Sequence, residues 1–139
     1  MSCVLRISGK ALDIDALLSS VALAPNQTWR KGELRSKAGA RTHTDSGVNF
    51  IASDAEFDAF DRQVDDATAF LTSNSAAVAA LASFPGVERA TLDFGVALFE
   101  GSFATFSCLP PSLVRLAAQV NLGIEISTYA CDTKQRAEG

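Results

Sequence analysis

The chain contains few of the residue types on which enzymes and metal sites depend. Its 139 residues include one histidine, one tryptophan and three cysteines, and no Cys-x-x-Cys pair occurs. The lone His43 has no second imidazole, and neither a G-x-S-x-G nor a Walker-type motif accompanies it. The cysteines Cys3, Cys108 and Cys131 are widely spaced, and we interpret them as reduced, mostly buried thiols. The sequence therefore predicts no catalytic residue, no metal site and no cofactor.

Positive charge and long apolar runs are also scarce. Lys and Arg number 12 against 16 Asp and Glu, which gives a formal net charge of −4. Proteins that bind nucleic acid usually carry a basic face, so we expect no nucleic-acid partner. No apolar stretch approaches the ~20 residues that span a bilayer. The N-terminus also lacks the pattern of a signal peptide. These absences predict a cytoplasmic protein that does not enter a membrane.

The composition that remains is that of a folded domain. The sequence is 47% hydrophobic and 20% charged, and it has nine Phe against one Tyr. Phe has no polar group, so most of these rings are expected in the core. We predict a single domain over residues 1–131 and a frayed polar tail over 132–139.

Hydrophobic periodicity predicts the elements of an α+β fold. Alternation and β-rich composition indicate strands, and steps of three and four indicate helices. The expected strands are 3–9, 48–53, 89–99, 102–108 and 124–130, and the expected helices are 13–23, 54–71, 76–84 and 110–123. Gly101 suggests a hairpin between the third and fourth strands. Ser53 and Glu56 suggest a capping box that opens the longest helix, with Phe57 and Phe60 on its core face.

This element order favours a particular class of architecture. We predict a mainly antiparallel sheet of about four or five strands, with helices largely on one face. That arrangement is a two-layer sandwich related to the ferredoxin-like folds. Such a topology by itself implies no function.

Four segments resemble a known family. They are "LRISGKALDIDAL", "APNQTWRKGE", "DFGVALFEGSFATFSCLPPSLVRLA" and "LGIEISTY", between Val4 and Tyr129. The chain resembles the bacterial family called domain of unknown function 4279. Its most distinctive segment here is Pro25 followed by Trp29, Arg30, Lys31 and Gly32. Family members often have a Trp at the start of the second strand, where this chain has Val48 and Phe50. The resemblance implies the fold and a bacterial source, but no activity.

A long loop from residue 26 to residue 47 carries concentrated positive charge. From Arg30 to His43 five Lys and Arg stand against Glu33 alone, whereas residues 54–66 carry six acids against Arg62. Loops of this length are often functional. Charge runs are nevertheless often only solvated faces, so the loop could equally be a connector.

Two functional hypotheses follow for this loop. The leading one is a non-catalytic interaction module that binds an acidic protein, or a second copy of itself, through the Trp29–Arg41 loop. The alternative is a binder of a small anion or metabolite, in which basic side chains hold a carboxylate or phosphate beside Trp29. The candidate site residues are Trp29, Arg30, Lys31, Arg41 and His43. An enzyme of unknown class is a third, weaker hypothesis.

Overall fold

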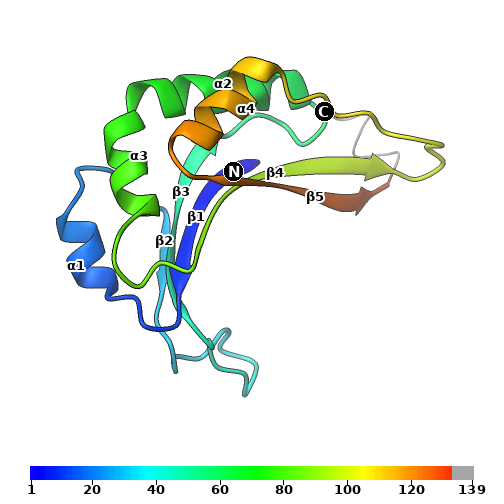
Figure 1. Cartoon of the computed structure of the whole chain (residues 1–139). Coiled ribbons are helices and arrows are strands. Elements are labelled where there is room, and N and C mark those ends of the chain that lie inside the picture. The colour runs from blue at the N-terminus through cyan, green and yellow to red at the C-terminus, as the bar shows by residue number, and fades with distance from the viewer. Residues whose placement is uncertain (133–139) are drawn as a thin grey trace.

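The computed structural model describes residues 1–132, so the predicted tail lies outside the described residues from 133 onward. It shows a five-stranded sheet in the order β2-β3-β1-β4-β5 with four helices (Figure 1). The strands are β1 (Cys3–Gly9), β2 (Gln27–Trp29), β3 (Ser46–Ser53), β4 (Arg89–Phe99) and β5 (Gly123–Cys131). The helices are α1 (Ile14–Ser19), α2 (Phe60–Ser73), α3 (Ser75–Ala82) and α4 (Pro111–Gln119).

The predicted α+β class and mainly antiparallel sheet are confirmed. β1 pairs antiparallel with β3 and β4, and β2 pairs antiparallel with β3. The pairing of β4 with β5 is parallel and continuous over nine residues, which makes the sheet mixed. The sheet bends strongly, and the helices lie on the outer side of the bend (Figure 1). No helix of residues 1–132 lies on its inner, concave face.

Strand alternation separates the two faces of the sheet. In β1, Leu5 and Ile7 are fully buried members of the hydrophobic core beneath the helices. Side chains at alternate positions point to opposite faces, so Arg6 between them lies on the concave face. β3 and β4 contribute Phe50 and Phe94 to the same core, which α2 closes with Leu71.

Local signals explain where helices begin and end. Asp13 caps α1, because its carboxylate accepts a hydrogen bond of 3.1 Å from the backbone N–H of Ala16. After α4, Asn121 has a φ of 61°, and the N–H of Leu122 bonds back to the carbonyl of Ala117. This left-handed residue satisfies a terminal carbonyl and turns the chain into β5. Asn is one of the few residues besides Gly that adopt the left-handed conformation readily.

The predicted strand at 102–108 is wrong. Residues 102–110 contain no strand, and Phe103 and Phe106 are 104% and 92% exposed. Both edges of β4 are already occupied, by β1 and by β5, so no position is left for a hairpin partner. Cys108 also lies in this segment and is exposed, so the prediction of a buried thiol is wrong there.

The predicted start of the longest helix is also wrong. α2 begins at Phe60, and the hydroxyl of Ser53 donates a 2.7 Å hydrogen bond to Asp66 instead of capping a helix. The residues before α2 form a short connection in which the Phe57 carbonyl accepts from the N–H of Ala97. This bond holds Phe57 beside β4, where its side chain is 39% exposed. The other predicted core residues of this helix, from Phe60 to Leu71, do face the core.

Candidate functional site

The concave face carries several polar residues, two of which are well covered. Asn49 of β3 and Asp93 of β4 are 5% and 6% exposed, and Arg6 lies between their strands on β1. Asp93 accepts a 3.0 Å bond from Arg6 Nη1 and a 2.7 Å bond from the hydroxyl of Ser127. Most buried polar groups in folded proteins have such partners. The concave face is thus an ordered polar surface.

Trp29 is fixed at one end of this face. Its indole lies directly over Gly47, where a Cβ atom would overlap the ring. The indole N–H donates a 3.0 Å hydrogen bond to Asp45, and the ring stacks on His43 with centroids 6.1 Å apart. Only glycine leaves room for a ring this close to the strand. Trp29 is half-buried and held by these contacts, with part of its surface open to solvent.

The long loop folds back on itself as an arm, which we call the basic arm (residues 30–45). The N–H of Gly32 donates to the carbonyl of His43, and the N–H of Arg35 donates to that of Arg41. Gly32 has a φ of 89°, a value that side-chain-bearing residues rarely adopt. At the base, the N–H of Lys31 donates to the hydroxyl of Ser46. These bonds bring His43 back beside Trp29.

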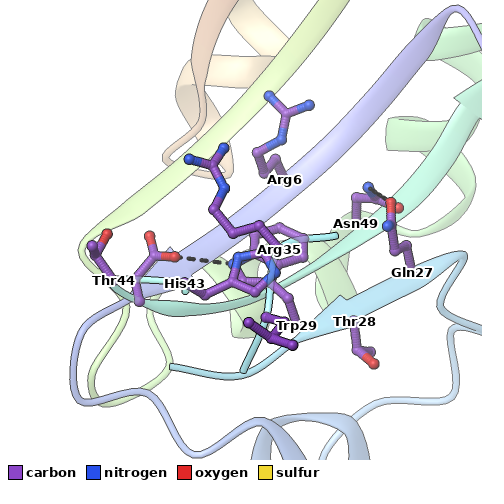
Figure 2. Close-up of a pocket in the computed structure, with 10 residues that line it drawn as sticks. Arg6, Gln27, Thr28, Trp29, Arg35, His43, Thr44 and Asn49 are labelled. Carbon is purple, nitrogen blue, oxygen red and sulfur yellow. Dashed lines mark hydrogen bonds between the residues drawn. The ribbon is translucent and has the colours of Figure 1, made fainter. Parts of the chain in front are cut away.

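A hollow of about 570 Å³ lies between the base of the basic arm and the concave face. We call it the Trp29 hollow. It is lined by Arg6, Gln27, Thr28, Trp29, Leu34, Arg35, His43, Thr44, Asp45 and Asn49. Figure 2 shows the guanidinium groups of Arg6 and Arg35 on the same side of the Trp29–His43 pair, with the amides of Gln27 and Asn49 nearby. The hollow thus combines an aromatic wall with several hydrogen-bond donors.

The lining of this hollow holds both signs of charge, from Arg6 and Arg35 and from the carboxylate of Asp45. Within residues 1–132, the side chain of Arg35 makes no ion pair or hydrogen bond, whereas Asp45 is engaged by the indole of Trp29. Arg6 approaches Asp93 and Glu125, at 3.0 and 3.7 Å, and both contacts use Nη1. Its Nε and Nη2 have no partner among the described residues and can donate elsewhere. The hollow can therefore supply charge-assisted hydrogen bonds to an anion.

The structure brings together only some of the predicted site residues. Trp29 and His43 line the hollow and contact each other. Arg30 instead forms a 2.7 Å ion pair with Asp15, the residue that follows the first position of α1. Lys31 and Arg41 are exposed on the basic arm and do not line the hollow.

Sequence reasoning missed Arg6, Gln27 and Asn49. Arg6 could have been found from the sequence, because it lies in the middle of a strand between the apolar residues Leu5 and Ile7. Alternation places it on the face of the sheet opposite to theirs. Asn49 lies similarly between two core residues of β3. Arg35 was visible only as one charge among five in the loop.

A second, smaller hollow of about 300 Å³ adjoins the first on the concave face. We call it the Tyr129 hollow. It is lined by Met1, Ser2, Val4, Arg6, Asn49, Phe57, Asp93, Gly95 and Tyr129. Arg6 and Asn49 line both hollows.

The described residues offer little for metal or thiol chemistry. No group of three His, Cys, Asp or Glu side chains within residues 1–132 is placed to hold a metal ion. Burial, with the negative charges of Asp93 and Asp66, raises the pKa of the Cys3 thiol far above its ordinary value. Cys3 therefore stays protonated and unreactive in the folded protein. None of the helices in the described part of the chain is long and apolar enough to cross a membrane.

These features define a small α+β domain with an open polar face. The model of the family described as Domain of unknown function (DUF4279) matches residues 1–131. The chain belongs to this family, as the resemblance of its four segments suggested. Comparison with curated proteins and with solved structures gave no match.

Proposed function

We propose that the protein is a non-catalytic binding protein that holds an anion in the Trp29 hollow. The observation that carries this proposal is Arg35, which has no ion pair or hydrogen bond within residues 1–132 and lies in the wall of a hollow that is also lined by Arg6 and His43. Such a cation beside an aromatic ring is suited to a carboxylate or a phosphate. The amides of Gln27 and Asn49 add neutral hydrogen-bond donors. The ligand is thus the small anion or metabolite of the second sequence hypothesis.

The net charge of −4 does not oppose this function, because a short basic rim acts locally. Salt screens exposed charges over about 8–10 Å, so distant carboxylates contribute little at the hollow. We further propose a bacterial cytoplasm as the compartment. All three cysteines are free, which suits a reducing environment.

Trp29 provides the test, because it is the only tryptophan and its ring forms part of the hollow. Its fluorescence would be titrated with phosphate, acetate, succinate and citrate, and calorimetry would confirm the stoichiometry. We expect saturable binding of at least one anion. Arg35→Gln should weaken that binding about tenfold or more, since hydrogen bonds to charged groups contribute about 1.5–3 kcal/mol.

Arg30→Gln is the matched control, because it removes an equal charge from the same arm but outside the hollow. Its affinity should change by less than about twofold. An equal loss in both variants would indicate general attraction to the arm and would contradict a specific site. No saturable response to any anion would refute the proposal.

A second candidate is the interaction module, in which the basic arm itself binds an acidic protein surface. Lys31, Lys37 and Arg41 are exposed without ion pairs among the described residues, and Leu34 beside them is 60% exposed. The exposed acids of α2, including Asp61 and Asp65, would suit the arm of a second copy. Salt-dependent dimerisation in sedimentation experiments, abolished by charge reversal at Lys37 and Arg41, would support it. A monomer at all concentrations and ionic strengths would rule out self-association.

A further inference from the structure

We propose that the Tyr129 hollow is a second subsite of the same binding face and receives an aromatic ring. The ligand of the protein would then be an anion that carries an aryl group, such as an aryl carboxylate or an aryl phosphate. This inference rests on the proposed function, because it assigns the other end of a ligand whose anionic group lies in the Trp29 hollow.

The position of the two hollows supports a single ligand. Arg6 and Asn49 line both of them, so no strand or helix separates the hollows. Their volumes of about 570 and 300 Å³ together are in the range that encloses a small organic molecule. A bare inorganic anion would fill only a small part of this space.

The wall of the Tyr129 hollow is suited to a ring. Phe57 and Tyr129 pack edge to face with centroids 5.6 Å apart and an interplanar angle of 76°. Both side chains remain substantially exposed, at 39% and 52%. Phe57 lies over Gly95, where a Cβ atom would overlap its ring. The glycine therefore lets a large apolar ring lie close to the sheet, as Gly47 does for Trp29.

Arg6 can contact both parts of such a ligand. Asp93 and Glu125 hold its guanidinium through Nη1. Its remaining nitrogens can donate to the anion, and its flat face can stack on an aromatic ring. One ordered side chain thus lies where the anionic group and the ring of the ligand would join.

Paired probes can test this assignment on the whole protein. Acetate would be compared with phenylacetate and 4-phenylbutyrate, and inorganic phosphate with phenyl phosphate. The two series also distinguish a carboxylate from a phosphate as the anionic group. We expect at least one aryl probe to bind about tenfold tighter than its simple anion, as an aromatic contact of this kind permits.

Variants in the wall of the Tyr129 hollow then show which residue gives the aryl probe its higher affinity. Tyr129→Ala should abolish the advantage of the aryl probe and leave the affinity of the simple anion unchanged, which also shows that the variant is folded. Tyr129→Phe should retain the advantage. Phe103→Ala removes a fully exposed ring that lines neither hollow, and it should change nothing.

Three results would overturn the second subsite while the proposed function stands. They are equal affinity for simple and aryl anions, a gain that survives Tyr129→Ala, and a gain that disappears in Phe103→Ala. Failure of every simple and aryl anion to bind would refute both proposals. A loss of simple-anion binding in Tyr129→Ala would also overturn the second subsite, because Tyr129 would then act on the Trp29 hollow.

Discussion

The two faces of the sheet are made by the same strands, yet they differ in what covers them. On the outer face, Leu5, Ile7, Phe50 and Phe94 are sealed beneath the helices with exposures of 0–1%. On the concave face, no helix of residues 1–132 is present, and the polar side chains of Asn49 and Asp93 hydrogen-bond to neighbouring side chains. Packing defines the first face, whereas hydrogen bonds and ion pairs define the second.

This difference shows how a polar face can be ordered without a second layer. Two of the rings on the concave face, those of Trp29 and Phe57, each rest on a strand glycine that leaves room for them. The outer face is expected to tolerate little change in volume, and the concave face little change at its two glycines.

The largest effect should come from truncating the outer-face core. Phe94→Ala removes a fully buried ring that also contacts Phe60 at a centroid distance of 5.6 Å. It should lower the free energy of unfolding by about 3–5 kcal/mol in urea denaturation. Phe103→Ala makes the same chemical change at an exposed position and should alter stability by less than about 0.5 kcal/mol. Similar losses in both variants would contradict this assignment of the core.

An intermediate effect is expected at the support of Trp29 on the concave face. Gly47→Ala forces the ring or the strand to move, and overpacking of this kind costs about 1–3 kcal/mol. Gly123→Ala is the control, because its nearest neighbour would be Ala90 O at 3.8 Å and no strain arises. Unfolding curves and the Trp29 emission maximum would be measured together. Unchanged emission in Gly47→Ala would argue against the ring lying on this glycine.

The smallest effect is expected for the ion pair that joins the basic arm to α1. Arg30 and Asp15 are 2.7 Å apart, but their side chains are 47% and 80% exposed. Exposed pairs typically contribute about 0–1 kcal/mol. A double-mutant cycle with Arg30→Ala and Asp15→Ala should give a coupling energy in that range, reduced further by salt. A coupling above about 2 kcal/mol would show that this contact anchors the arm.

The covered face was largely predictable from the sequence, because its residues follow a regular period. Alternation found β1 and β3, and steps of three and four found α2 from Phe60 onward. The errors arose where local signals competed with long-range pairing. Ser53 fits the sequence pattern of a helix cap, but its hydroxyl donates a hydrogen bond to Asp66 instead. The segment at Phe103 has a β-rich composition, but the edge of β4 with which it would pair is occupied by β5.

The candidate site was less predictable, for a different reason. The loop around Trp29 stood out by composition, and two of its candidates, Trp29 and His43, do line the hollow. Arg6 lies more than twenty positions before Trp29 in the sequence and reaches the hollow only because β1 pairs with β3. No local sequence pattern predicts that these two residues are neighbours.

The shape of the basic arm has a consequence for proteolysis. The arm is exposed from Arg30 to Thr42 and contains five of the sites at which trypsin cleaves, whereas β2 and β3 on either side are paired within the sheet. A single cut there would leave both fragments bound by the strands that flank it. The arm is thus the natural position at which a tag or another domain could be inserted. The effect of such an insertion on binding would show whether the arm is only a connector or a functional segment.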